Sequence, residues 1–191
     1  LDAVLLTHAH SDHLHGIDDI RAINRLINAP LPLFSSKETL ETVAQRFPYV
    51  FEPLSENAAF YYKATLDAQT VVPGNSFNAG GIETMPIAQD HGFMDTLGFR
   101  FGDFAYSTDL VSMGEDSFEL LSGTKVWMLG TFSDKPHPTH LDVDRAIEWI
   151  NRIKPERAIL THLGPGLDYE ALSARLPGNV QVAFDGMVLD I

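Results

Sequence analysis

The segment at positions 7–13 constrains this chain more than any other part of it. It reads Thr-His-Ala-His-Ser-Asp-His, so three of the chain's eight histidines and one aspartate fall within a single turn. The segment follows an apolar run and precedes a helix-like pattern. In an extended stretch, residues two apart share a face, so His8 and His10 can bind one cation together. Asp12 and His13 follow where the chain turns and can bind a second cation. A purely structural polar turn rarely carries four strong metal ligands.

The composition predicts one globular domain that depends on no cysteine chemistry. The chain has 191 residues, 45% of them hydrophobic, which is enough for a sizeable core. It contains no cysteine, which excludes a disulfide framework, a zinc ribbon and a thiol nucleophile. Any metal must therefore be held by His, Asp and Glu. A cysteine-free chain is compatible with a reducing compartment, and we expect a cytoplasmic protein.

The charge balance limits the classes of partner. The 26 acidic residues outnumber the 13 lysines and arginines, and the net charge is −13. A long nucleic acid normally requires a basic surface, so we do not expect one as the partner. A small phosphate ester stays compatible, because bound divalent cations reverse the local field. No apolar run approaches the roughly 18 residues that span a bilayer, so no membrane partner is expected. Neither a serine-hydrolase G-x-S-x-G elbow nor a phosphate-binding P-loop is present.

The alternation of strand-like and helix-like segments predicts an α/β fold, either a sandwich or a layered sheet. The expected strands are 2–7, 31–34, 66–72, 82–88, 96–101, 103–108, 125–130, 157–161, 180–184 and 187–191. The expected helices are 15–27, 37–46, 115–121, 141–153 and 168–175. Gly102-Asp103 and Asp185-Gly186 fit hairpin turns. Ser35 with Glu38, and Thr139 with Asp142, fit capping boxes at two of the helices.

The first residues run straight into a strand-like segment, without an initial Met or a signal peptide. We therefore expect that N-terminal strands are missing from this chain, and that residues 1–191 form one metallo-hydrolase domain without them.

The pattern His-x-His-x-Asp-His after an apolar strand resembles the signature of the metallo-β-lactamase superfamily, whose fold is an αββα sandwich. The resemblance covers essentially the whole chain and implies three later ligands, each at the end of a later strand. His91 follows strand 82–88, Asp109 follows strand 103–108, and His162 follows strand 157–161. The resemblance then implies one metal on His8, His10 and His91, and a second on Asp12, His13 and His162. Asp109 and a water molecule would bridge the two.

Such a ligand set indicates two divalent cations. Cations about 3.5–4 Å apart lower the pKa of a shared water and stabilise the charge that builds on substrate oxygens. Histidine and carboxylate ligands suit Zn²⁺, Mn²⁺ or Fe²⁺, and the sequence does not distinguish these metals.

A second His-containing segment narrows the type of hydrolase. Residues 137–140 read His-Pro-Thr-His, which is similar to a stretch in the phosphoribosyl 1,2-cyclic phosphate phosphodiesterases of the superfamily. In that branch a histidine at the position of His140 lies beside the scissile phosphate. With Thr139 as N-cap, His140 would be the first helical residue, where the helix dipole lowers the pKa of an imidazole. His140 could then protonate a leaving alkoxide. His137 is either a second substrate contact or a loop residue.

These observations predict a metal-dependent phosphodiesterase that acts on a small cyclic phosphate or nucleotide-like ester. Asp12, Asp109 and His140 are the expected catalytic residues, and His140 and His137 the expected substrate contacts. The alternatives are a tRNA 3′-processing endonuclease, a hydrolase of lactones, thioesters or β-lactams, and a non-catalytic metal-binding or carrier protein. For the oligomeric state, a homodimer is the alternative to a monomer.

Overall fold

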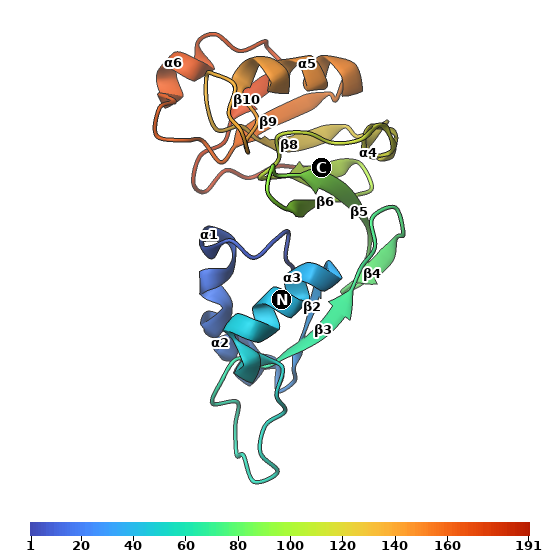
Figure 1. Ribbon diagram of the computed structural model, residues 1–191, viewed down its shortest axis with the longest axis vertical. Coiled ribbons are helices and arrows are strands. Elements are labelled where there is room, and N and C mark those ends of the chain that lie inside the picture. The colour runs from blue at the N-terminus through green and yellow to red at the C-terminus, as the bar shows by residue number, and fades with distance from the viewer. The chain divides into compact units, whose positions relative to one another are not determined.

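The computed structural model describes all residues, 1–191, and they form two compact units. The first unit contains Leu1–Val72 and Phe77–Ile82, and the second contains Pro73–Ser76 and Glu83–Ile191. Each unit combines a β-sheet with helices, which confirms the α/β class. Figure 1 shows the first unit in blue to green and the second in green to red. No helix is long and apolar enough to cross a membrane.

The sheet of the first unit has the order β1-β2-β3, with all strands parallel. β1 is Val4–Leu5, β2 is Leu31–Ser35 and β3 is Leu66–Thr70. Along β2 every second residue is buried, so Leu31 and Leu33 enter the core while Pro32 and Phe34 are less covered. This alternation follows directly from the two-residue period of a strand. β4, Phe77–Ala79, also belongs to this part of the chain, which the sequence analysis interpreted only as a turn region.

The helices of the first unit pack on this sheet through one apolar cluster. They are α1 (Ser11–Leu14), the 3-10 helix η1 (His15–Asp19), α2 (Ile20–Ile27), α3 (Lys37–Arg46) and the 3-10 helix η2 (Pro48–Val50). Leu14, Ile17, Leu40 and Val43 meet the strands in this cluster. The bounds of α3 agree with the prediction, but its N-cap is Ser36, which accepts from the Thr39 amide, instead of Ser35.

The sheet of the second unit follows the order β10-β9-β8-β7-β6-β5. The neighbours from β10 to β7 are parallel, whereas β6 is antiparallel to both β7 and β5. The strands are β5 (Ile82–Asp90), β6 (Asp95–Phe101), β7 (Phe104–Ser107), β8 (Val126–Gly130), β9 (Arg157–Thr161) and β10 (Val180–Val182). Gly102, at a φ of 56°, makes the predicted hairpin between β6 and β7.

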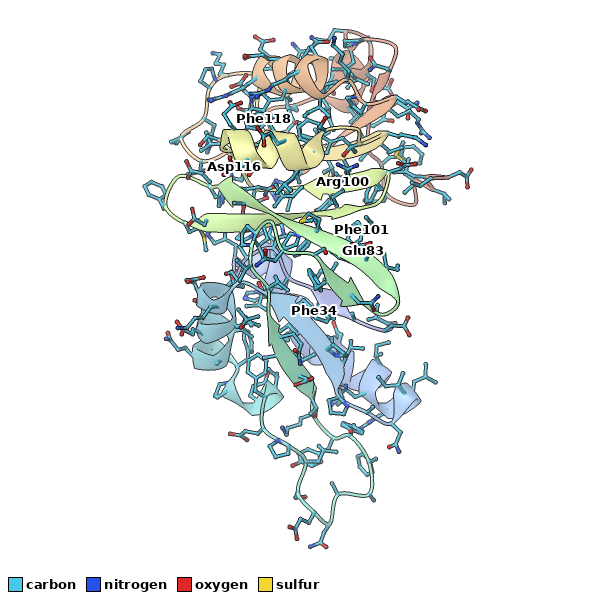
Figure 2. The ribbon with its side chains drawn as sticks, turned by 90° about the vertical axis from the view of Figure 1, so that its right-hand side faces the viewer. Phe34, Glu83, Arg100, Phe101, Asp116 and Phe118 are labelled. Carbon is cyan, nitrogen blue, oxygen red and sulfur yellow. The ribbon has the colours of Figure 1, made fainter.

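The helices of this unit are α4 (Glu115–Leu121), α5 (Val143–Ile153) and α6 (Tyr169–Ser173). The apolar stripe of α5 is buried, with Ala146 and Ile150 in the core. Phe118 of α4 packs edge-on against Trp149 of α5, with ring centroids 5.2 Å apart. Arg100, labelled with Phe118 in Figure 2, donates to the carbonyl of Leu120 in the last turn of α4 and to that of Ser122 just after the helix.

Two sequence expectations in the second unit are wrong. The segment 187–191 forms no strand, and Asp185-Gly186 therefore makes a turn without a hairpin. The cap of α5 is Asp142, whose carboxylate accepts from the Arg145 amide, instead of Thr139. As a result His140 lies in the loop before α5 and is not its first helical residue. The helix dipole is thus not what sets the ionisation of His140.

Candidate metal centre

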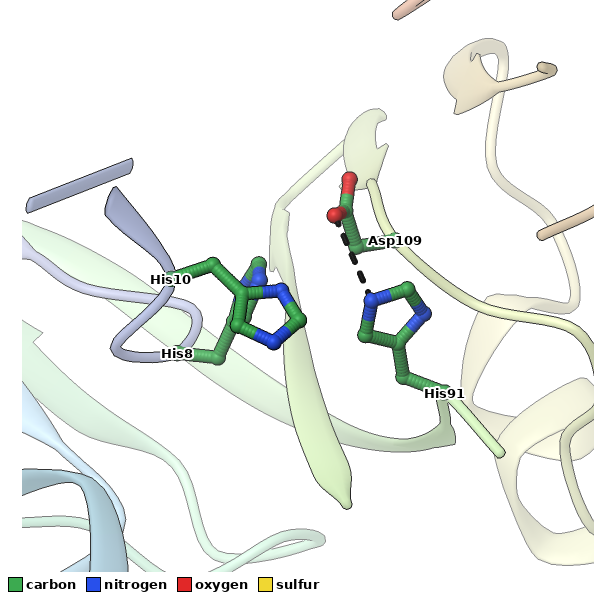
Figure 3. Close-up of side chains that lie close together, drawn as sticks. All are labelled: His8, His10, His91 and Asp109. Carbon is green, nitrogen blue, oxygen red and sulfur yellow. Dashed lines mark ion pairs between the residues drawn. The ribbon is translucent and has the colours of Figure 1, made fainter. Parts of the chain in front are cut away.

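The first unit brings His8 and His10 together at the end of β1. His8 is fully buried, whereas His10 is exposed. Their ring centroids are 4.6 Å apart, in an edge-to-face arrangement (Figure 3). Each offers a ring nitrogen within 4.8 Å of the other, so the two can share one cation.

Asp12 and His13 belong to the first turn of α1, where the chain changes direction. The Asp12 carboxylate lies 3.5 Å from Nε2 of His13. The His13 ring also packs 4.4 Å from the ring of His8. The structure therefore gathers all four predicted residues of the first unit into one group.

Hydrogen bonds from the segment itself and from β2 and α3 hold residues 6–9 in place. The Thr7 hydroxyl and Nδ1 of His8 lie 3.0 Å apart and are hydrogen bonded, which orients the His8 ring. The hydroxyl of Ser35 in β2 donates to the carbonyl of Leu6 over 2.6 Å. Arg46, the last residue of α3, donates to the carbonyl of Ala9, between the two histidines. Arg46 could not be predicted from the sequence, because only the fold brings the end of α3 to this loop.

The second unit places its three predicted ligands at the ends of three strands. His91 follows β5, Asp109 follows β7 and His162 follows β9. One carboxylate oxygen of Asp109 lies 3.5 Å from Nε2 of His91, as Figure 3 shows, and the other lies 3.2 Å from Nε2 of His162. Asp109 is 3% exposed, so this carboxylate is almost completely removed from water. One acidic group thus faces two imidazoles, one with each oxygen.

Two of these ligands have unusual backbone conformations. Asp109 has a φ of 51° and His162 a φ of 56°, in the left-handed region that residues with a Cβ rarely occupy. Such conformations persist where the surrounding structure imposes them, and they concentrate at functional sites. For His91, Nδ1 lies 2.6 Å from the carbonyl of Thr139, which leaves Nε2 directed at Asp109.

His140 lies in this same group, in an aromatic environment. Its ring stacks on that of Phe132, with centroids 4.4 Å apart, and on that of His162, 5.5 Å apart. The His91 ring contacts it edge-on at 4.7 Å. His137 is half-buried, 5.2 Å from the His140 ring, and its Nδ1 accepts from the Thr139 amide. Phe132, which the sequence analysis did not single out, is therefore the residue that orients His140.

Burial lowers the pKa of His140 from 6.5 to about 4. The main cause is desolvation, which disfavours the charged ring. The Asp109 carboxylate opposes this shift, whereas the neighbouring rings of His91, His162 and His137 add to it. His140 is therefore neutral near pH 7 until another negative charge comes close to it.

The donor chemistry of both groups fits divalent cations. In the first unit, His8 with His10 and Asp12 with His13 each offer ligand atoms within 4.8 Å of one another. In the second unit, Asp109 does so with His91 and with His162. Imidazole nitrogens and carboxylate oxygens without thiolate suit Zn²⁺, Mn²⁺ or Fe²⁺. In the second unit one buried carboxylate, that of Asp109, lies beside both histidines.

Comparison with known proteins identifies sequence relatives along the chain. Residues 1–163 match the family described as the beta-lactamase superfamily domain. An octanoyltransferase of Porphyromonas gingivalis is 31% identical over 192 residues, which cover 98% of this chain. The chain spans only 37% of the length of that relative. A ribonuclease Z of Mycobacterium bovis is 25% identical, over 97% of this chain and 78% of the relative.

Solved structures share the fold. The crystal structure of a diphosphatase of the PhnP family superposes with a TM-score of 0.88 at 29% identity, covering all of this chain and 72% of that one. Zn²⁺-bound PqqB from Methylobacterium extorquens superposes with a TM-score of 0.72 at 19% identity, covering 99% of this chain and 73% of that one. At that identity PqqB supports the fold alone. The expected metallo-β-lactamase-like fold and the similarity to the phosphodiesterase branch are confirmed.

Proposed function

Because the chain belongs to the beta-lactamase superfamily domain family, we propose that it is a metal-dependent hydrolase of a small phosphodiester or phosphate anhydride. The single observation that carries this proposal is the carboxylate of Asp109. Its two oxygens face two different histidines at 3.5 and 3.2 Å, in a nearly dry environment. Two neighbouring cations need a buried carboxylate whose two oxygens are directed at different ligand groups, and Asp109 has this arrangement.

The proposed site uses ligands from both units, which would then act as one metallo-hydrolase domain. His8, His10 and His91 hold one cation, and Asp12, His13 and His162 hold the other. Asp109 bridges them. When bound, the two cations lower the pKa of a water molecule and stabilise the charge that builds on phosphate oxygens. We propose Zn²⁺ or Mn²⁺, with Fe²⁺ as an alternative, because the donor set accepts each of them.

His140 is proposed to handle the proton of the leaving group. In the free protein its ring is neutral, since the pKa is lowered to about 4. An anionic phosphate beside the ring favours the charged form and raises this pKa, so substrate binding would load His140 with the proton that it later donates. The ring of Phe132 prevents His140 from turning away, because the two stack at 4.4 Å. His137, next to His140, is proposed as a second contact to the phosphate.

The substrate class follows from the relatives and from charge. The diphosphatase of the PhnP family and the ribonuclease Z both act, by their names, on phosphate linkages. A net charge of −13 opposes binding of an extended RNA and leaves a small phosphate ester or diphosphate as the favoured substrate. The octanoyltransferase relative favours a second candidate, the hydrolysis of an acyl thioester by the same activated water.

The first test compares substrates in the presence of Mn²⁺ or Zn²⁺. A 2′,3′-cyclic nucleotide, a bis-aryl phosphodiester, a dinucleoside diphosphate and octanoyl-CoA would be incubated with the protein, each with a chelator control. Chelator-sensitive cleavage of a phosphate substrate is the expected result. Cleavage of octanoyl-CoA alone would replace the phosphodiesterase proposal with the thioester one. A metal-loaded protein that cleaves none of them would favour a carrier role.

The ligand assignment is tested with Asp109→Ala. Because a bridging carboxylate serves both cations, this variant should lose affinity for both, which metal analysis after desalting measures. Asp168→Ala is the matched control, since Asp168 is an exposed acidic residue that caps α6 and is not a proposed ligand. Retention of two cations by Asp109→Ala would contradict the bridging role.

A further inference from the structure

A buried polar network lies behind Asp109, within the sheet of the second unit. Gln89 of β5 and Thr96 of β6 are directly opposite each other in the antiparallel register. They are 2% and 1% exposed, so both polar side chains are almost completely removed from water. Thr108 and Asp109, just after β7, complete the network.

The network binds two successive backbone carbonyls at the turn that presents the ligand. The Gln89 amide donates to the carbonyl of Thr108 over 2.9 Å, and the Thr96 hydroxyl donates to the carbonyl of Asp109 over 2.9 Å. The same Gln89 amide also donates to the Thr96 hydroxyl over 3.1 Å. These two hydrogen bonds are not part of the strand pairing, because β7 ends at Ser107, before both carbonyls.

The donor and acceptor roles are fixed by the partners. A backbone carbonyl only accepts, so Gln89 must direct its NH₂ group at Thr108. Thr96 gives its single hydroxyl proton to Asp109, and therefore must accept from Gln89. Both contacts require the same orientation of the Gln89 amide. If the positions of its nitrogen and oxygen were interchanged, both hydrogen bonds would be lost.

This orientation of the Gln89 amide destabilises the fold, because it leaves the amide oxygen without a partner. Its Oε1 is buried without a hydrogen-bond partner. This orientation of the Gln89 side chain also requires a glycine at position 98 in the neighbouring strand β6. A Cβ at Gly98 would lie 2.4 Å from Oε1 of Gln89. A buried acceptor without a partner destabilises a fold. An apolar residue would fill the same space without a buried acceptor that lacks a partner, so packing alone does not account for Gln89 at this position.

We infer that Gln89 and Thr96 are positioning residues that hold the Thr108-Asp109 backbone in the geometry that metal bridging needs. The two carbonyls anchor the chain on either side of the Asp109 Cα, which has a φ of 51°. The Thr108 hydroxyl adds a bond of 2.9 Å to Oδ1 of Asp109. Because ligand orientation depends on such outer contacts, their loss should weaken metal binding without removing any ligand. This inference rests on the proposed bridging role of Asp109.

The test removes one hydroxyl and keeps the shape of the side chain. Thr96→Val should weaken binding of Mn²⁺ by about 10- to 100-fold, the usual effect of losing an outer contact to a ligand. Affinity is measured by competition with a chelator. Electron paramagnetic resonance of the Mn²⁺-loaded protein gives a second readout, because the exchange coupling between two bridged ions should diminish. Thr96→Ser keeps the hydroxyl and should restore both.

Thr124→Val is the matched control. Thr124 is a buried threonine of the same unit, 3% exposed, and its hydroxyl has no hydrogen-bond partner. The same chemical change there should leave Mn²⁺ affinity and coupling as in the parent. Gln89→Met provides an independent variant, should Thr96→Val not fold. It removes the bond to Thr108 together with the orphan acceptor, so Mn²⁺ affinity should fall while the melting temperature of the metal-free protein stays close to the parent's.

The outcomes separate this inference from the proposed function. If the parent binds two Mn²⁺ ions and both Thr96→Val and Gln89→Met bind them equally well, the network only supports the fold and the positioning role is overturned. If the parent itself binds no Mn²⁺, the proposed metal site fails and the inference fails with it. Reduced affinity in Thr96→Val and Gln89→Met, with rescue by Thr96→Ser and no effect of Thr124→Val, supports both.

Discussion

At the scale of single residues, a change at His140 would distinguish catalysis from metal binding. Its ring contacts two of the proposed ligands, but its own part in the proposed mechanism is proton transfer. We therefore expect His140→Ala to keep both cations and to lose about 10²- to 10⁴-fold in kcat on a phosphodiester. Metal content and turnover would be measured on the same preparation. Unchanged turnover with full metal content would remove His140 from the mechanism.

The buried state of the same ring predicts how the metal-free protein responds to acid. The pKa of His140 is lowered, mainly by burial, from 6.5 to about 4 in the folded protein. The unfolded chain therefore binds a proton that the folded chain refuses, and the stabilising contribution of the neutral ring is complete above pH 6.5 and lost as the pH falls toward 4. Over this window the melting temperature of the chelator-treated parent should fall more steeply than that of His140→Ala. His15→Ala, at an exposed histidine, should follow the parent. Parallel curves for the parent and His140→Ala would contradict the shift.

At the scale of elements, each ligand depends on where a strand ends and what lies beside that end. Gly130, the last residue of β8, lies against the Asp109 turn, where an added Cβ would come within 3.1 Å of the Thr108 Cα and 3.3 Å of the Asp109 amide. Backbone atoms cannot move aside as the end of a side chain can, so Gly130→Ala should destabilise the fold by about 1–3 kcal/mol. It should also weaken metal binding, because the ligand turn must shift.

Gly178→Ala is the control for this prediction, since nothing lies within 4 Å of the Cβ it would add. Chemical denaturation measures both variants in the metal-free state, and chelator competition then measures their affinity for Mn²⁺. Equal stability of Gly130→Ala and Gly178→Ala would show that the Asp109 turn tolerates the displacement.

The elements also show what the sequence alone could predict. The bounds of α3 and α4 were predictable because their apolar patterns are local. His91, Asp109 and His162 were proposed as ligands because the resemblance to the superfamily implies a ligand at the end of each of three later strands. The segment 187–191 alternates like a strand but finds no partner strand, which local pattern cannot reveal. Asp142 instead of Thr139 caps α5, since two residues of suitable chemistry compete there. Strand register brings Gln89 and Thr96 to the Asp109 turn, and the placement of α3 brings Arg46 to the carbonyl of Ala9. The residues that flank them in the sequence predict neither contact.

At the scale of the whole molecule, the proposed ligands divide between the two units of the chain. His8, His10, Asp12 and His13 belong to the first, and His91, Asp109 and His162 to the second. If each cation takes ligands from both units, cation binding and the folding of the two units are coupled. A cation at about 100 times its dissociation constant stabilises a protein by about 2.7 kcal/mol, so metal removal should lower the melting temperature of both units together.

Paired substitutions test this sharing directly. His8→Ala and His91→Ala should each remove one cation, and the double variant should still keep one, because both residues are proposed to serve the same ion. His8→Ala combined with His162→Ala should instead leave none, since these residues are assigned to different ions. Metal content after desalting distinguishes the two doubles, and the melting temperature provides an independent measure, because non-additivity is expected only for the pair that shares an ion. If the His8/His91 double loses both cations while the His8/His162 double keeps one, the assignment is reversed. If each unit keeps its own cation whatever is changed in the other, the units bind metal separately and the single bridged site is wrong.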